Sequence, residues 1–393
     1  MLARIWRFFV AASDWRTIWR KLNGRTFVDV VFVTNMRDEV DRRRYLGKWH
    51  PPEGHFNGPR YWLGNIAGRT RALDITTDEM GKVSGRRKAR EQFYATTQWA
   101  VDNGAKVVLL AATTKRLFEG PELAELKAKF PDMIFTIGDN GTVLLLIKET
   151  LRALEAAGLK PGHSRIAVLG PYGFLGDITT CTLKNLGYEI VGAGPNPGGL
   201  ERVVEAYGIP VCQTLAEIGK VDAVVACTHS EKISLTTESV ELLRHDNKKL
   251  LVIDVAEPSN LRYREYQKCK DVVIRQDAGN AYAPGLKYVL GAISYRMFRL
   301  TRGVTFGCFA EALSLAAALK RGERIPREVD WLTVNEGEME LVKEMFEKDG
   351  FRIPSPRCFG QPVKSFDLNL AEVGKRTTRT PVWKLAAQKL HLL

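Results

Sequence analysis

Short apolar runs alternate along the chain with longer segments in which apolar positions recur every three or four residues. In the first 160 residues this pattern predicts three strands and three helices. The strands are expected at 28–36, 105–113 and 133–140, and the helices at 85–105, 121–130 and 141–158. Residues 37–80, which contain prolines, glycines and then aromatic and basic residues, are expected to be irregular. Strands alternating with helices predict a parallel sheet covered by helices.

A second unit of the same kind begins near residue 159. Its strands are expected at 165–170, 188–194, 221–228, 249–256 and 269–276, and its helices at 177–187 and 200–208. This is the pattern of a doubly wound domain. From about residue 295 the chain is expected to be mostly helical.

The predicted fold class is therefore α/β, with an N-terminal α/β substrate domain, a Rossmann-type doubly wound parallel sheet and a C-terminal helical part. The domains are placed at 1–24 (an amphipathic basic helix), 25–158 (substrate binding), 159–295 (NADP binding) and 296–393 (a helical region with a basic tail).

Length and composition agree with this division. A chain of 393 residues exceeds one ordinary core, and 45% hydrophobic with 26% charged residues is a globular composition. The net charge of +13 attracts anions in general, without choosing among nucleic acid, acidic lipid and an acidic carrier protein. The six cysteines are scattered with no CxxC pair, which argues against a disulfide framework and against a metal site. A reducing cytosol fits best.

The N-terminal segment leaves two interpretations open. No stretch has the length of a transmembrane helix. Residues 1–24 interleave tryptophan, phenylalanine and isoleucine with arginine and lysine, which is typical of a helix lying at a membrane surface. A surface helix packed on the body of the protein would have the same composition. The basic, amphipathic C-terminal end slightly favours the membrane interpretation, so a peripheral position at the inner face of a membrane stays open beside the cytosol.

The segment RIAVLGPYGFLGDITT carries the clearest chemistry. A predicted strand ends in three glycines spaced GxxGxxG, and a helix follows. Such a turn brings the backbone close to a pyrophosphate, which the free N–H groups of the helix then bind. The next strand ends in GAGPNPGG, which has neither the acid that usually binds the ribose of NAD nor an arginine for a 2′-phosphate, although Arg202 follows closely. We therefore expect NADPH, with NADH not excluded. The candidate cofactor-binding residues are Gly170, Pro171, Tyr172, Gly173, Phe174, Leu175, Gly176, Asn196, Thr228, His229, Val255 and Ala256.

Several stretches resemble the long-chain fatty acyl-[acyl carrier protein] reductases of cyanobacteria, which form fatty aldehydes. They are 135–170, 252–261, FGCFAEALSL at 306–315, and 331–351. The nucleotide domain is more distantly similar to those of glutamyl-tRNA reductases and shikimate dehydrogenases. From the residues alone, Cys308 in its apolar helix would be a packing residue. The resemblance implies that it is the nucleophile.

The chain departs from that family in three places, one of which is the absence of the arginine expected after the second strand of the nucleotide domain. GPYGFLG stands where the family has a loop closer to GATGDIG, and IGDNGT at 137–142 has Gly141 where the family has a histidine. The expected function is NADPH-dependent reduction of a long-chain acyl thioester, carried by acyl carrier protein or coenzyme A, to an aldehyde through a Cys308 acyl-enzyme. Substrate-binding roles are assigned by position to Thr113, Thr136, Asn140 and Thr142. Basic residues at 85–90 and 42–44 are candidate docking patches for the acidic carrier.

Two other classes of function remain open. A dehydrogenase of the shikimate or amino-acid type would act on a small polar substrate and would need a lysine–aspartate pair, for which Asp139 with Lys115 or Lys148 is a candidate. A non-catalytic regulator that binds NADPH would need neither that pair nor Cys308. Nucleic acid is not an expected partner, because the basic residues are spread along the chain without an aromatic–basic RNA motif.

Overall fold

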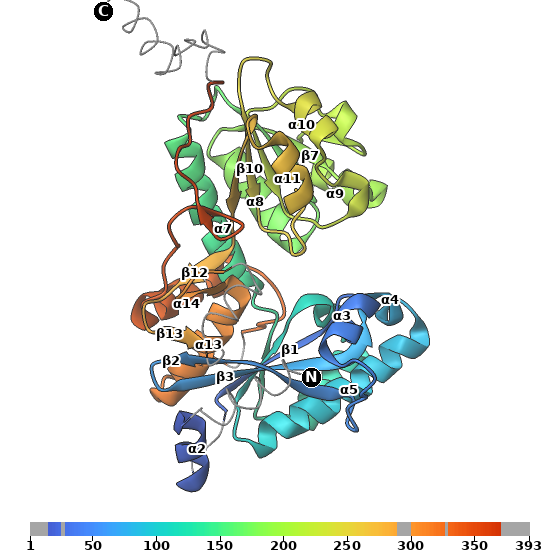
Figure 1. The fold of residues 1–393 in the computed structure, drawn as a ribbon, viewed down its shortest axis with the longest axis vertical. Helices are drawn as coiled ribbons and strands as arrows, with labels where there is room; N and C mark the ends of the chain where they lie inside the picture. Colours follow the sequence, from blue (N-terminus) through green and yellow to red (C-terminus); the bar gives the residue numbers. More distant parts are fainter. Residues whose placement is uncertain (1–14, 25–27, 289–299, 327–328, 371–393) are drawn as a thin grey trace, which may run out of the picture.

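The computed structural model describes residues 15–24, 28–288, 300–326 and 329–370, and Figure 1 shows two α/β bodies, one above the other. Helix α7 (Asp139–Ala156) runs from the lower body along the upper one. Both sheets have apolar clusters on their two faces, which explains why most strands read as continuous apolar runs. The basic tail and the first fourteen residues lie outside the described residues.

The lower body contains a six-stranded sheet in the order β13-β2-β3-β1-β4-β5. Strands β3, β1, β4 and β5 are parallel, whereas β2 and β13 pair antiparallel at one edge. The strand bounds are β1 (Val30–Met36), β2 (His55–Leu63), β3 (Ile66–Thr76), β4 (Val107–Leu110), β5 (Ile134–Thr136) and β13 (Leu286–Tyr288). The helices are α3 (Glu39–Tyr45), α4 (Thr77–Met80), α5 (Val83–Asp102), the 3-10 turn η1 (Ala112–Arg116) and α6 (Pro121–Lys129).

The prediction of irregular structure at 37–80 was wrong, because β2, β3 and two short helices form there. Strand β3 is buried at all eleven positions although it contains Arg69, Arg71 and Asp74. A strand covered on both faces shows no alternation of apolar and polar residues, and these charged residues masked its apolar character. Arg71 lies over the ring of Trp99 on α5, with 4.1 Å from guanidinium carbon to ring centre, so its burial has a specific partner.

The upper body has the strand order β11-β10-β9-β6-β7-β8, with every neighbouring pair parallel. In chain order this is the 3-2-1-4-5-6 arrangement of dinucleotide-binding sheets, so the predicted Rossmann-type fold is confirmed. The strands are β6 (Arg165–Leu169), β7 (Glu189–Ala193), β8 (Val211–Cys212), β9 (Ala223–Ala226), β10 (Leu250–Asp254) and β11 (Val273–Asp277). The helices are α8 (Phe174–Asn185), α9 (Pro197–Tyr207), α10 (Thr237–Leu243) and α11 (Tyr263–Cys269), with the 3-10 turns η2 (Leu215–Glu217) and η3 (Glu231–Ile233).

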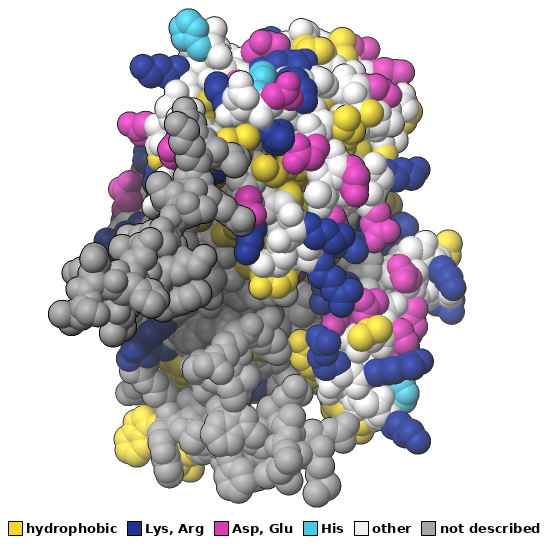
Figure 2. Space-filling model, turned by 45° about the horizontal axis from the view of Figure 1, so that its top comes forward, with side chains coloured by type: hydrophobic (Ala, Val, Ile, Leu, Met, Phe, Trp, Pro, Cys, Tyr) yellow, Lys and Arg dark blue, Asp and Glu magenta, His cyan; other side chains and the backbone are white. Residues whose placement is uncertain are grey.

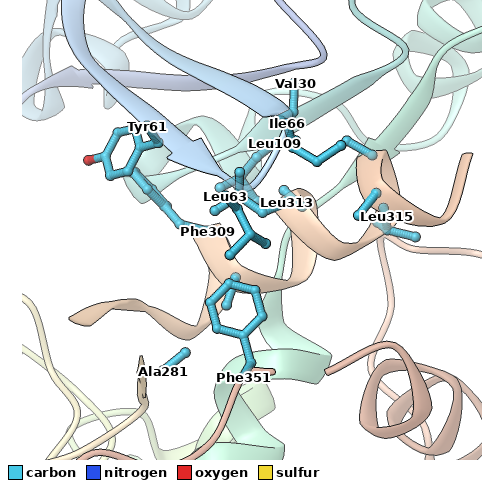
Figure 3. Packing of buried hydrophobic residues seen from close by; sticks show 14 of the residues in the cluster. Val30, Tyr61, Leu63, Ile66, Leu109, Ala281, Phe309, Leu313, Leu315 and Phe351 are labelled. Carbon is cyan, nitrogen blue, oxygen red and sulfur yellow. The ribbon is translucent and has the colours of Figure 1, made fainter. Parts of the chain in front are cut away.

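The C-terminal part returns to the lower body. Helix α13 (Gly307–Lys320) is apolar almost all round, as expected for a helix buried on every side. It packs against β1, β3 and β4, and Figure 3 shows Phe309 and Leu313 under the strands. The ring of Phe309 stacks on Phe32 with 4.3 Å between ring centres. The remaining elements are α14 (Glu336–Asp349), the pair β12 (Asn280–Tyr282) and β14 (Val304–Phe306), and the pair β15 (Arg357–Cys358) and β16 (Gln361–Pro362).

The structure differs in two details from the predicted domains. Strand β13 falls within 159–295, yet it pairs with β2 in the lower sheet. The C-terminal region contains short strands besides its helices. Helix α2 (Trp15–Leu22) is attached through Arg20, which binds Asp29 at 3.1 Å, while Trp19 is 65% exposed. Within the described residues no helix is long and apolar enough to span a bilayer. Association of residues 1–24 with a membrane surface stays a prediction.

Candidate active site

The loop between β6 and α8 has the geometry that a pyrophosphate requires. The chain turns at Gly170, whose φ is +79°, a backbone angle that residues other than glycine rarely adopt. A Cβ on Gly176 would lie 2.0 Å from the carbonyl oxygen of Gly170, so the helix can approach the strand only through glycine. Gly173 is exposed and caps α8 without a side-chain hydrogen bond. The first N–H groups of α8 are thus open to an anion, and these residues fit a dinucleotide phosphate.

The other candidate cofactor-binding residues lie around this loop or at the carboxyl ends of neighbouring strands. Thr228 follows β9, and its Cβ lies 2.8 Å from where a Cβ on Gly170 would be. His229 lies beside it, and partial burial of the imidazole together with the charge of Arg116 lowers its pKa. The remaining residues are in the loop and the start of α8 (Pro171, Tyr172, Phe174, Leu175), at the cap of α9 (Asn196) and after β10 (Val255, Ala256). The structure therefore places the named residues in the loop, at the start of the helices that follow, or at carboxyl ends of strands of the same sheet.

The carboxyl ends of the two sheets lie near enough for their charged groups to interact. Arg37 follows β1 in the lower body, and Glu257 follows β10 in the upper body. Burial raises the pKa of Glu257, and the positive charge of Arg37 opposes that shift. The charge of Arg116, after β4 in the lower body, lowers the pKa of His229 in the upper body, in the same direction as burial. Ligands of open α/β sheets bind outside the carboxyl ends of strands, so two such edges define a two-sided site.

Cys308 is the second residue of α13, and the loop after β5 packs directly on it. A Cβ on Gly138, which has φ +71°, would lie 2.4 Å from the Cβ of Cys308. A Cβ on Gly307 would lie 2.7 Å from the Cα of Thr142, so α7 and α13 begin in contact. Burial raises the pKa of the Cys308 thiol to about 11, although Lys115 lowers it. The thiol is therefore protonated at neutral pH before a substrate arrives.

Lys115 and Asp139 form an ion pair beside this cysteine. Lys115 lies on η1 after β4, and Asp139 is the first residue of α7. Burial lowers the pKa of Lys115, but Asp139 and Cys308 outweigh it and the net shift is upward. The structure thus pairs Asp139 with Lys115, while Lys148 is exposed further along α7. This is the pair named for the dehydrogenase alternative, and it lies beside the cysteine named for the thioester route.

Glu311 is a buried carboxyl one helical turn after Cys308, and sequence reasoning missed it. The hydroxyl of Thr136 donates to its Oε1, and the N–H of Gly141 donates to its Oε2 at 2.7 Å. Burial raises the pKa of Glu311 to about 7, and the charge of Asp139 adds to the shift. An acid within the apolar run of FGCFAEALSL, three residues after the cysteine, was the available signal.

The four predicted substrate-binding residues have different surroundings. Thr136 binds Glu311, and the hydroxyl of Thr142 donates to the carbonyl oxygen of Gly138. Asn140 is fully buried, and its side-chain amide donates to the carbonyl oxygen of Thr333. Thr113 lies after the end of β4, where its N–H donates to the side chain of Asn35. Thr136 and Thr142 shape the loop around Cys308 and Glu311, whereas Asn140 connects that loop to the segment before α14.

No model of a known protein family and no curated protein sequence matches the chain. Among solved structures it is similar to L-tryptophan dehydrogenase from Nostoc punctiforme, with 11% identity over 82% of this chain and 89% of that one and a TM-score of 0.38. Shikimate 5-dehydrogenase from Thermus thermophilus is 15% identical over 82% of this chain and 100% of that one, with a TM-score of 0.36. The nucleotide-binding domain of glutamyl-tRNA reductase from Thermoplasma volcanium is 16% identical over 35% of this chain and 84% of that one, with a TM-score of 0.24. The chain spans 57% of the length of a dipicolinate synthase chain from Bacillus halodurans. The assignment of the fold rests on the strand order described above.

Proposed function

We propose that this protein is an NADPH-dependent oxidoreductase that reduces a long-chain acyl thioester to an aldehyde, with Cys308 as the nucleophile. One observation carries the proposal. Cys308 lies at the start of a buried helix, next to the Lys115–Asp139 ion pair, which occupies the carboxyl edge of the lower sheet. The charge of Lys115 lowers the pKa of the thiol against the larger effect of burial, and the start of a helix also stabilises an anion there.

The chemistry of this chain's own residues begins with transfer of the acyl group. The Cys308 thiol gives up its proton, its sulfur bonds to the thioester carbonyl carbon, and the bond from that carbon to the carrier sulfur breaks. The departing carrier thiolate takes up the proton, so charge and atoms balance. Lys115, held by Asp139, is placed to stabilise the negative charge that develops on the carbonyl oxygen.

The dinucleotide would be held by the turn at Gly170, the start of α8 and the strand ends after β9 and β10. When bound, NADPH supplies the hydride that reduces the acyl carbon. The bond from Cys308 to that carbon then breaks, the aldehyde leaves, and the sulfur regains a proton. The net change is thioester plus NADPH plus one proton, giving aldehyde, carrier thiol and NADP⁺.

The start of α5 supports an acidic carrier as partner. Lys82, Arg86, Arg87 and Lys88 are exposed, and the first turn of this helix holds no acid. Four cations at the positive end of a helix dipole repel one another and the dipole, an arrangement that an acidic partner would relieve. Helix α5 follows β3 and α4, so the patch lies near the carboxyl end of β3, at the same edge of the sheet as Lys115. On the face drawn in Figure 2, basic and acidic side chains are intermixed.

Reversing three of these charges tests the carrier assignment. The variant R86E/R87E/K88E is expected to lose at least about tenfold in kcat/KM for an acyl group on acyl carrier protein, and to change little for the same group on a short thiol. Reversal of Lys343 and Lys348 on α14 is the control for reversing positive charges elsewhere on the surface. An equal loss with both acyl donors would contradict docking at α5.

A second candidate function is a dehydrogenase that oxidises or reduces a small polar substrate through Lys115 and Asp139. The observed ion pair favours it, since a lysine beside a carboxylate can exchange a proton with a substrate hydroxyl. In that reaction Cys308 is a packing residue. The two functions therefore differ in what the C308A variant does.

Intact-protein mass spectrometry tests the proposed function. The protein is incubated with a palmitoyl thioester in the absence of nicotinamide. We expect a mass gain equal to one palmitoyl group in the wild type, none in C308A, and slower acylation in K115M. An acylated C308A, or no adduct in a wild type that binds NADPH, would contradict the nucleophile and favour the Lys115–Asp139 dehydrogenase.

A further inference from the structure

Tyr172 fills the space between the phosphate loop and the connection from β7 to α9. Its ring lies so close to two glycines that neither could carry a side chain. A Cβ on Gly194 would lie 2.5 Å from the ring, and a Cβ on Gly199 would lie 2.7 Å from it. The ring is half-buried and packs on the cluster beneath the sheet. Gly194, directly after β7, and Gly199, in the first turn of α9, thus make room for this one side chain.

The hydroxyl of Tyr172 has a fixed partner at the same place. The N–H of Asn196 donates to the phenol oxygen at 3.3 Å. Asn196 is in turn the cap of α9, and its side chain accepts from the N–H of Gly199. The phenol oxygen therefore acts as an acceptor toward the protein, and its own hydrogen is available to donate to a ligand.

The end of β7 is where a dinucleotide-binding sheet meets the adenosine ribose. In sheets that bind NAD, a carboxylate there accepts from the 2′-hydroxyl, and the same carboxylate repels a 2′-phosphate. In this chain β7 ends at Ala193, and Gly194 follows. The hydroxyl of Tyr172, bound to the N–H of Asn196 two residues further on, lies in the region that the carboxylate would otherwise take.

We propose that the phenol of Tyr172 selects the dinucleotide by donating a hydrogen bond to the 2′-phosphate of NADPH. A neutral donor does not repel the phosphate as an acid would, and it adds a hydrogen bond to a charged acceptor, which is stronger than one to a neutral acceptor. This inference rests on the dinucleotide part of the proposed function and is independent of the chemistry at Cys308.

Titration of the full chain with NADPH and NADH, followed by nucleotide fluorescence, tests the selection without any turnover. The Y172F variant keeps the ring and removes the donor. We expect it to lower the affinity for NADPH about tenfold and the affinity for NADH less than about twofold. We expect Y172D to reverse the order of the two affinities. Titration with 2′,5′-ADP and 5′-ADP by calorimetry isolates the adenosine half, and Y172F is expected to weaken only the former.

Each contrary result has a distinct meaning. An equal loss of both dinucleotides in Y172F, or no loss of NADPH, would overturn the role of the phenol. Loss of NADPH affinity in R202A with full affinity in Y172F would assign the selection to Arg202, which is exposed on α9, instead. A wild type that binds neither dinucleotide would refute the cofactor in the proposed function. A wild type that binds NADPH but forms no acyl-enzyme would refute only the thioester chemistry.

Discussion

Replacement of Glu311 by glutamine should change how the stability of the protein depends on pH. Glutamine keeps the acceptor for the N–H of Gly141, and its amide can donate to the hydroxyl of Thr136, as a protonated Glu311 would. Burial raises the pKa of Glu311 in the folded chain to about 7, against an ordinary value of 4.5. Between these two values the folded state holds a proton that the unfolded state has lost, so stability falls as pH rises.

The magnitude follows from the two values. For one group with pKa values of about 7 folded and 4.5 unfolded, the free energy of unfolding falls by about 2–3 kcal/mol between pH 5 and pH 8. The E311Q variant lacks this contribution. We therefore expect the stability of the variant, measured against the wild type, to rise by about 2–3 kcal/mol from pH 5 to pH 8.

Urea unfolding at four pH values across this range measures the difference. Glu149, whose pKa burial raises to about 8, contributes equally to both proteins and cancels. Replacement of the exposed Glu347 by glutamine is the control for loss of a carboxyl charge. A wild-type-to-E311Q difference that stays constant across the range would show that Glu311 ionises normally in the folded chain, and would refute the account of its burial.

Three further predictions concern the site and its frame. K115M should slow alkylation of Cys308 by iodoacetamide about tenfold at pH 8, because loss of the adjacent cation raises the thiol pKa by on the order of one pH unit. An unchanged rate would show that the charge of Lys115 does not act on the Cys308 thiol. G176A should lower the free energy of unfolding by about 1–3 kcal/mol, because its Cβ would overlap the backbone, whereas G173A has room and should not. R275M should lower the free energy of unfolding, measured in urea, by about 3–5 kcal/mol, because it leaves the carboxylates of Asp254 and Asp277 without their buried partner. A loss under about 1 kcal/mol would contradict that pairing.

The sequence predicted those parts of the molecule whose signals are local. The turn at Gly170 and the helix after it are encoded within a dozen residues, and the alternation of strands and helices indicated the Rossmann-type order. Strand β3 was missed because it contains buried arginines, one of which, Arg71, packs its guanidinium over the ring of Trp99, a residue distant in the sequence. The same holds for the site. Lys115 and Asp139 lie far from Cys308 in the sequence, and the packing of α7 against α13 together with the Lys115–Asp139 ion pair brings them beside it, whereas Glu311 lies one turn away on the same helix.

The most direct test of the central claim is a single turnover of isolated acyl-enzyme with NADPH deuterated at the position that gives the hydride. Acylated wild-type protein is separated from free thioester and mixed with the deuterated dinucleotide. We predict that the palmitoyl mass disappears from the protein and that the released palmitaldehyde carries one deuterium at its carbonyl carbon. Release of palmitic acid, or an acyl group that stays on Cys308 while NADPH is bound, would contradict the reduction proposed here.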